Sequence, residues 1–201
     1  MTVRIGILLF DDAEELDFVG PFEVFTMAKS VAPDDFHVQL VAQRMDPVRC
    51  AKGMRVLPDA TLETCGPLDV LLVPGGQGTR REVANTTLLD WIATVARTAT
   101  WTTSVCTGAL LLTAAGPARG KRVTTHWAYV KTLRERGEAA EVLENYRYVQ
   151  DGNVVTSAGV SAGIDMALWL IGQIRDAAFA RDVQHRMEYD PSPPYAALTT
   201  K

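Results

Sequence analysis

Cys106 is the residue of this chain best placed to act as a nucleophile. It ends a strand-like run and stands directly before Thr107, Gly108 and a small apolar helix, in the sequence WTTSVCTGALLL. At the N-terminus of a helix, unpaired backbone N–H groups and the helix dipole favour a thiolate. The N–H groups of Thr107 and Gly108 are also placed to hold a negative charge that develops on a reacting atom. We therefore interpret Cys106 as a reactive thiol, and Cys50 and Cys65 as structural cysteines.

Asp17 is a second candidate, at the end of the acid-rich segment DDAEELD. The crowding of carboxyl groups in this segment favours the protonated form of one of them. Asp17 lies between apolar Leu16 and Phe18, so a half-buried acid here could keep its proton and deliver it to a substrate beside the thiol. The alternative is that Asp17 only caps the helix that begins there. The residues alone leave both interpretations open.

Two further loops, each after a predicted strand, contain groups that could contact a ligand. PGGQG offers the backbone N–H groups of Gly75 and Gly76, although a simple tight turn explains it equally well. His126 is either a base or polar contact at a strand end, or a structural histidine, and Trp127 follows it. Ligands of parallel α/β sheets bind beyond the carboxyl ends of the strands. We therefore expect four loops to converge on one site: 11–17, 74–78, 106–108 and 126–127.

Composition narrows the class of protein. The 201 residues are 47% hydrophobic and 22% charged, with a net charge of −4, which is typical of one soluble globular domain. Lys and Arg form no run, so we expect no nucleic-acid partner. The apolar N-terminal run is too short for a signal peptide, and no stretch approaches the roughly 20 apolar residues of a membrane helix. We predict a cytoplasmic protein that does not contact a membrane.

The numbers and spacings of cysteine and histidine argue against a disulfide-bonded protein and against a metal-dependent one. The three cysteines are widely spaced and form no CxxC motif, which disfavours a disulfide framework. The three histidines are not at ligand spacing from one another, so no metal site is predicted.

Strands and helices alternate along most of the chain. This order predicts an α/β fold of flavodoxin-like type: a doubly wound, mostly parallel sheet with helices on both faces, forming one domain over residues 1–201. The predicted strands are 3–10, 37–42, 70–73, 102–105 and 122–125, with hairpins at 48–57 and 146–157. The predicted helices are 17–30, 88–97, 107–115, 128–136, 161–174 and one from 176, the helix at 161 capped by Ser161. The proline-rich tail EYDPSPPYAAL is predicted to form an ordered cap.

Six sequence blocks together resemble the ThiJ/PfpI superfamily, whose fold is flavodoxin-like and similar to the class I glutamine amidotransferases. They are DFVGPFEVF, LLVPGGQG, SVCTGALLLTAAG, KRVTTHWA, SAGVSAGIDMAL and EYDPSPPY. Some of them also occur in superfamily domains fused to transcription regulators. Within the superfamily, the Asp at position 17 and the Thr at position 107 make the chain resemble the isonitrile hydratases. Peptidase-like and glyoxalase-like members have Glu at the place of Asp17, and the peptidase-like ones have His after the cysteine.

This resemblance implies the addition of water to an isocyanide, R–NC, to give an N-substituted formamide without any cofactor. It implies Cys106 as nucleophile, Asp17 as general acid and base, and a Thr107 hydroxyl that positions water or Asp17. It also implies a homodimer. The predicted substrate-binding residues are Gly75, Gly76, Gly108, His126, Trp127 and Phe18. Two alternatives stay open: a non-catalytic redox or electrophile sensor that uses the same cysteine, and a glyoxalase-like aldehyde hydratase.

Overall fold

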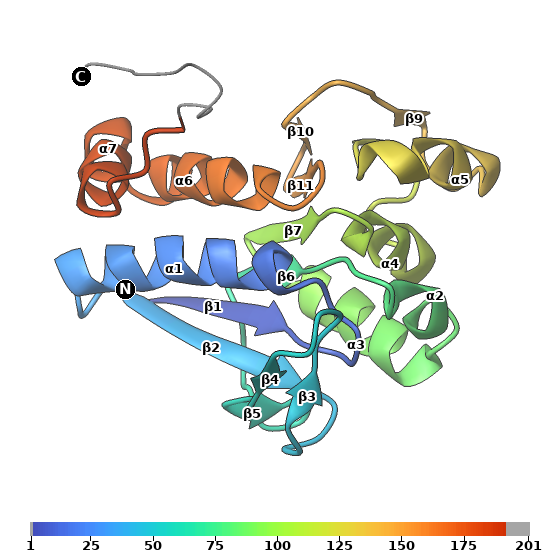
Figure 1. Ribbon diagram of the computed structural model, residues 1–201, viewed down its shortest axis with the longest axis horizontal. Helices are drawn as coiled ribbons and strands as arrows, with labels where there is room; N and C mark the ends of the chain where they lie inside the picture. Colours follow the sequence, from blue (N-terminus) through green and yellow to red (C-terminus); the bar gives the residue numbers. More distant parts are fainter. Residues whose placement is uncertain (1, 192–201) are drawn as a thin grey trace.

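A seven-stranded sheet forms the centre of the computed structural model, which describes residues 2–191 (Figure 1). The strand order is β10-β11-β7-β6-β1-β2-β5, and every pair is parallel except β10 with β11. The strands are β1 (Val3–Leu8), β2 (Phe36–Ala42), β5 (Ala60–Thr61), β6 (Val70–Val73), β7 (Trp101–Val105), β10 (Tyr148–Asp151) and β11 (Val154–Ser157). The predicted α/β fold with a mostly parallel sheet is confirmed.

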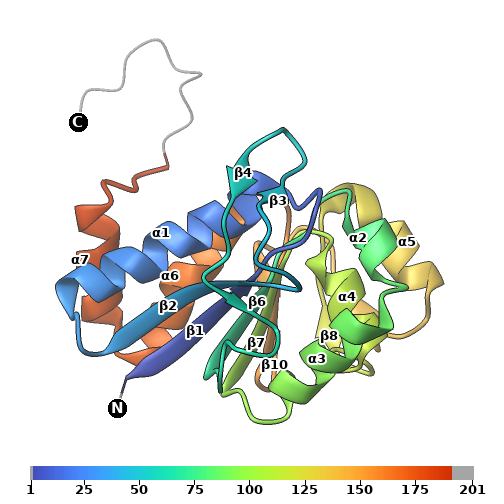
Figure 2. The same cartoon turned by 90° about the horizontal axis from the view of Figure 1, so that it is seen from below.

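Helices cover both faces of this sheet (Figure 2). One face carries α1 (Glu15–Val31), α6 (Ala162–Ile174) and α7 (Ala177–Arg186), which pack against one another. The other face carries α2 (Thr79–Glu82), α3 (Thr86–Ala96) and α4 (Gly108–Ala115), with α5 (Val130–Glu135) beside them (Figures 1 and 2). The chain leaves β1 toward the first face and leaves β6 toward the second. The carboxyl ends of these neighbouring strands therefore form the crevice in which such folds bind ligands.

Burial explains why the central strands are the easiest to recognise in the sequence. All four residues of β6 are fully buried, as are Ile5, Ile7 and Leu8 of β1. A parallel strand that is covered on both faces has no polar side to alternate with, so it is read as a continuous apolar run. Phe18 and Phe25 of α1 add two more buried side chains to the core on one face.

The smaller strands were predicted less well. The hairpin of β3 (Val48–Arg49) with β4 (Arg55–Val56) is antiparallel, as expected. The predicted strand 122–125 ends at Val123, as β8 (Arg122–Val123), and pairs in parallel with β9 (Glu141–Val142). Thr124 and Thr125 leave that ladder because they bond elsewhere: Thr124 N–H donates to Thr156 Oγ1 at 2.8 Å, and Thr125 Oγ1 donates to the Cys106 carbonyl at 2.8 Å.

Helix ends show two differences from the predictions. Ser161 precedes α6, but its hydroxyl makes no capping hydrogen bond and lies 3.4 Å from Arg147 Nη2, so the predicted capping role is wrong. Asp176 does cap α7, since its Oδ1 accepts the Phe179 N–H at 2.8 Å. The predicted helix at 128–136 is a 3₁₀ turn (Trp127–Tyr129) followed by α5.

Over residues 2–191, no helix combines the length and apolar character needed to cross a membrane. The predicted ordered tail lies largely outside the described residues, which end at Pro191.

Candidate active site

Cys106 occupies a strained corner between β7 and α4. Its φ of +56° lies in the left-handed region, which is uncommon for a residue with a Cβ and marks local backbone strain. Hydrogen bonds hold the corner in place: the Cys106 N–H donates to the carbonyls of Ser157 (3.2 Å) and Ala158 (3.1 Å), and its own carbonyl accepts from Thr125 Oγ1. The side chain is almost entirely buried. The predicted position of Cys106, between a strand and a helix, is therefore confirmed.

Gly108 makes this turn possible. A Cβ at this position would lie 2.2 Å from the Val73 carbonyl oxygen and 2.8 Å from the Pro74 carbonyl oxygen. The first residue of α4 thus rests directly against the end of β6, and only glycine fits there. The contact brings the loop after β6 beside the loop after β7.

Asp17 lies inside α1, fully buried, rather than at its cap. The N-cap residue is Glu14, and no side chain caps this helix end, so the capping interpretation of Asp17 is wrong. Asp17 Oδ2 accepts the Gly75 N–H at 3.0 Å. Its Oδ1 is buried and has no hydrogen-bond partner among residues 2–191. A buried carboxyl oxygen without a partner is costly, and this carboxyl group lies beside the Cys106 thiol.

Burial raises the pKa of both the Asp17 carboxyl and the Cys106 thiol. Burial raises the pKa of Asp17 from 3.8 to about 7, against the lowering effect of the Gly75 N–H. Burial also raises the pKa of Cys106 to about 12, with the charge of Asp17 as the next cause. Hydrogen bonds from Thr107 lower the pKa of the thiol but do not offset these two effects. The thiolate of low pKa expected at the helix start is therefore wrong: the sulfur holds a proton while Asp17 ionises.

Thr107 also bonds to the loop after β6 and to α2. Its Oγ1 accepts the Gly76 N–H at 3.0 Å and lies 3.2 Å from both the Gly76 carbonyl and Thr79 Oγ1. The Gly76 N–H is thereby engaged and not free to hold a developing charge. Thr79 is fully buried and was not recognised in the sequence, because a threonine near a turn carries no distinctive pattern.

Gly75 fills the narrow space between Asp17 and Thr107, and its substitution tests how tightly this space is packed. A Cβ there would lie 2.5 Å from Thr107 N and 2.8 Å from Asp17 Oδ2. Gly75→Ala should therefore displace both groups and lower the turnover of the enzyme by roughly 100-fold, the usual cost of a misplacement near 1 Å. Gly172→Ala is the control, since its Cβ would meet its nearest neighbour at an ordinary 3.6 Å. Unchanged activity in Gly75→Ala would show that the close packing is not required.

His126 and Trp127 stand at the edge of the site. The His126 ring packs on Gly159, where a Cβ would lie 2.2 Å from His126 Cδ2, and its Nδ1 accepts the Ala128 N–H at 3.2 Å. Burial lowers the pKa of His126, with smaller and opposite effects from Glu14 and Arg80. The imidazole is therefore neutral at pH 7. Trp127 is 82% exposed.

A cavity of about 300 Å³ lies beside these two residues. It is lined by Thr125 and Ala158, which hold the Cys106 backbone, and by His126 and Trp127. Phe18, predicted to wall the substrate pocket, is instead buried in the core. Of the six predicted substrate-binding residues, His126 and Trp127 thus line a cavity, and the three glycines lie where their neighbours leave no room for a side chain.

Charged residues that the sequence analysis did not identify surround the acid-rich loop of residues 11–17, which we call the acid loop. The β3–β4 hairpin lies on the start of α1: the Ala51 N–H donates to the Ala13 carbonyl at 2.9 Å. The Lys52 N–H donates to Glu15 Oε1 at 2.7 Å, and the Lys52 ammonium group pairs with Glu14. Both Glu14 and Lys52 act on the pKa of Asp17, in opposite directions. Lys52 lies far from Asp17 in sequence, so only the fold reveals this contact.

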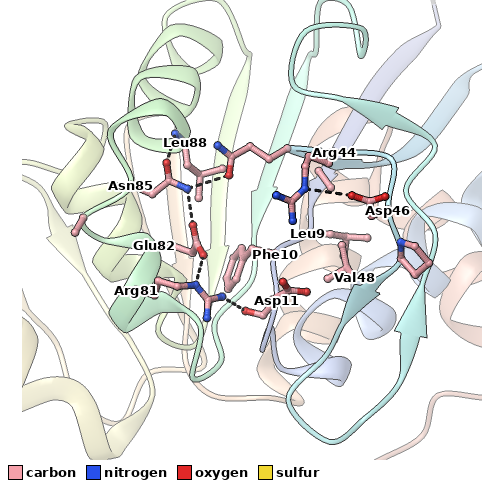
Figure 3. Close-up of a pocket in the computed structure, with 14 residues that line it drawn as sticks. Leu9, Phe10, Asp11, Arg44, Asp46, Val48, Arg81, Glu82, Asn85 and Leu88 are labelled. Atoms are coloured by element: carbon pink, nitrogen blue, oxygen red, sulfur yellow. Dashed lines mark hydrogen bonds and ion pairs between the residues drawn. The ribbon is translucent and has the colours of Figure 1, made fainter.

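A larger cavity of about 450 Å³ lies behind the acid loop and α2 (Figure 3). Its floor is apolar, and its rim carries charged side chains, among them Arg81, which points toward Asp11 and Glu82. Neither Cys106 nor Asp17 lines it. Within residues 2–191, no three His, Cys, Asp or Glu side chains gather as metal ligands would.

Comparisons with known proteins show the family of this chain. Residues 3–173 match the model of the DJ-1/PfpI family. An isonitrile hydratase of Pseudomonas putida is 42% identical over 195 residues, which is 97% of this chain and 82% of that protein.

Among solved structures, a ThiJ/PfpI family protein from Pseudomonas syringae superposes with a TM-score of 0.88 at 34% identity, over 99% of this chain and 80% of that one. Drosophila melanogaster DJ-1beta has a TM-score of 0.83 at 20% identity, over 95% of this chain and all of that one, which shows a shared fold. The chain belongs to the DJ-1/PfpI family.

Proposed function

We propose that this chain is an isonitrile hydratase, which adds water to R–NC and releases R–NH–CHO. One observation carries the proposal: a buried thiol, Cys106, lies beside a buried carboxyl group, Asp17, whose Oδ1 has no partner among the described residues. The similarity to the Pseudomonas putida isonitrile hydratase supports the same activity.

In the first step, Cys106 sulfur attacks the isocyanide carbon. At neutral pH the proton resides on the sulfur, so ionised Asp17 takes it as the S–C bond forms. Asp17 then delivers this proton to the same carbon. The product is a thioimidate, Cys106–S–CH=N–R, and Asp17 is again ionised. Oδ1 is the carboxyl oxygen free to carry the proton, since Oδ2 accepts the Gly75 N–H.

In the second step, water attacks the thioimidate carbon. Asp17 accepts a proton from this water and passes it to the nitrogen, which gives a tetrahedral intermediate, Cys106–S–CH(OH)–NH–R. Breakage of the C–S bond releases the formamide, and the hydroxyl proton returns to sulfur through Asp17. One carboxyl group thus moves three protons in turn, and a pKa of about 7 suits a group that must both accept and donate.

Among the backbone donors predicted to stabilise developing charge, Thr107 fits best. Its N–H bonds to the Cys106 sulfur and lowers the pKa of that thiol. The N–H groups of Gly75 and Gly76 already bond to Asp17 and Thr107. In this proposal the two glycines therefore position the acid and the threonine, while the Thr107 N–H faces the charge on sulfur.

The pH dependence of kcat/KM should report the ionisation of Asp17. The active form of the pair holds one proton, on sulfur, so protonation of Asp17 below its pKa of about 7 stops the reaction. We expect kcat/KM to fall about tenfold per pH unit below this pKa and to level off above it. Rates from pH 5 to 9 on a single isocyanide measure this. A flat profile would show that no group with this pKa takes part.

Turnover separates the hydratase from a sensor. Purified protein with para-nitrophenyl isocyanide should yield many molecules of the formamide per chain. A sensor would be modified once at Cys106 and then stop. The raised pKa of this thiol disfavours the sensor, since the thiolate is the form that oxidants attack. An assay with methylglyoxal tests the glyoxalase-like alternative, and turnover of methylglyoxal but not of the isocyanide would overturn our proposal.

Two further predictions accompany this proposal: the homodimer that the family resemblance implies, and the cytoplasmic location that the amino-acid sequence predicts. Sedimentation of the purified protein tests the first, and fractionation of cells tests the second.

A further inference from the structure

Arg80 is a cation without an acidic partner at the edge of the Cys106 site. Its Nη1 donates to the Gly76 carbonyl at 2.6 Å, the same carbonyl that Thr107 Oγ1 approaches at 3.2 Å. Its guanidinium group lies 4.2 Å from the centre of the Tyr129 ring. These two contacts hold the group in one place while leaving it exposed to solvent. Among residues 2–191, no carboxylate lies within 4.0 Å of it.

The next residue shows how different this arrangement is. Arg81 pairs with Glu82 at 2.8 Å and with Asp12 at 3.3 Å. Its guanidinium group also donates to the Asp11 carbonyl (Figure 3). Arg81 is therefore explained by the packing of α2 against the acid loop. Arg80 has no such structural charge to neutralise, and within the described residues its Nε and Nη2 donate no hydrogen bond.

The charges around Arg80 leave it unopposed. Glu14 and Arg80 both affect the pKa of His126, in opposite directions. The carboxylate of Glu14 already pairs with the Lys52 ammonium group. Asp12 and Glu82 pair with Arg81. The edge of the site formed by Arg80, Tyr129 and His126 therefore presents a fixed positive charge and aromatic faces.

We propose that Arg80 binds an anionic group on the substrate, so that the isocyanides that this protein uses best carry a carboxylate on an aromatic or similarly flat substituent. A guanidinium group can donate two parallel hydrogen bonds to one carboxylate. The Nε and Nη2 donors of Arg80, which are free among the described residues, are on the same side of the group and can form such a pair. The rings of His126 and Tyr129 lie beside this guanidinium group, with centroids 6.2 Å apart, and offer contact for a flat group. The substrate class rests on the proposed hydratase function, but the anion site itself does not.

Alkylation of Cys106 tests the anion site without any turnover. Iodoacetate and iodoacetamide react with the same thiol and differ mainly in charge, so the ratio of their rate constants cancels differences in thiol reactivity. A charge-assisted hydrogen bond is worth about 10- to 100-fold. We expect Arg80→Gln to lower the iodoacetate-to-iodoacetamide ratio at Cys106, followed by peptide mass spectrometry, by at least about tenfold.

Two variants serve as controls. Arg97→Gln removes the same charge at the end of α3, where the Arg97 side chain bonds, among the described residues, only to Thr94, and should leave the ratio unchanged. Arg80→Lys keeps the charge and should retain part of the preference. An unchanged ratio in Arg80→Gln, or an equal loss in Arg97→Gln, would overturn the anion site.

Substrate kinetics test the proposed class. For wild type, kcat/KM should be higher with 4-isocyanobenzoate than with phenyl isocyanide, and Arg80→Gln should remove this preference while keeping activity on the neutral compound. An equal loss on both compounds would show that Arg80 only supports the loop, and would overturn its role in recognition. If neither isocyanide is turned over, the hydratase function fails, and the alkylation ratio still decides whether Arg80 binds anions.

Discussion

Cys106→Ala should abolish the production of formamide from para-nitrophenyl isocyanide. Without the sulfur no S–C bond forms, and the buried Asp17 carboxyl has no thioimidate to protonate or hydrate. Loss of a catalytic nucleophile commonly lowers kcat by a factor of about 10⁴ or more. The side chain is 6% exposed and fills little volume, so the variant should fold like the wild type. Formamide release, followed by absorbance or chromatography, measures the effect.

The other buried cysteine provides the control. Cys50 lies just after β3, is 1% exposed, and has a pKa raised to about 11 by burial and nearby acids. Cys50→Ser should leave turnover largely intact, because this thiol is inert and is not part of the Cys106–Asp17 pair. Substantial turnover in Cys106→Ala, with a normal circular dichroism spectrum, would exclude covalent catalysis by this residue.

Asp17→Asn should nearly abolish turnover while making the protein more stable. The amide oxygen of Asn can still accept the Gly75 N–H, so the local structure should persist. It cannot take the proton from sulfur or return it to carbon, and loss of a general acid and base typically lowers kcat by about 10²- to 10⁴-fold. The thiol should still react with iodoacetamide, which distinguishes lost proton transfer from a lost nucleophile. Full hydratase activity in this variant would contradict the role of Asp17.

The gain in stability should depend on pH. Because the pKa of Asp17 rises from 3.8 to about 7 on folding, the native state binds this proton more tightly than the unfolded state does. Its contribution to the free energy of unfolding is therefore fully present below pH 3.8 and is lost as the pH rises through about 7. Removing the buried charge should stabilise the protein at pH 8 by an amount on the order of 4 kcal/mol, and by less at pH 5. Urea unfolding of both proteins at these two pH values measures it, and equal gains would contradict the shift.

The fold was largely predictable where burial is uniform. The strands β1 and β6 are continuous apolar runs because neither face of them meets water, and each precedes a helix that covers one face. Strands β5 and β9 were not predicted, since each has two residues and owes its place to a single neighbour. Two residues are too few to show the period of a strand.

The site was predictable where chemistry and position coincide, and less so where it depends on contacts across the fold. Cys106 and Asp17 were found because a thiol at a corner and an acid between apolar residues are unusual. The sequence could not show that burial would outweigh the helix start and raise the pKa of the thiol. Nor could it show that Thr107 Oγ1 bonds to Gly76, or that Lys52 and Arg80 flank the site, because these contacts join segments distant in the chain.

The hydrogen bonds of the Cys106 corner also bear on how the protein folds. The corner is held by Thr125 and by the carbonyls of Ser157 and Ala158, while the acid comes from residue 17. During synthesis the ribosome must therefore complete most of the chain before the site can close. Contacts of such long sequence separation form late in folding. We expect the thiol of the nascent chain to be open to oxidants and electrophiles until then, and to become protected in the same event that makes it active.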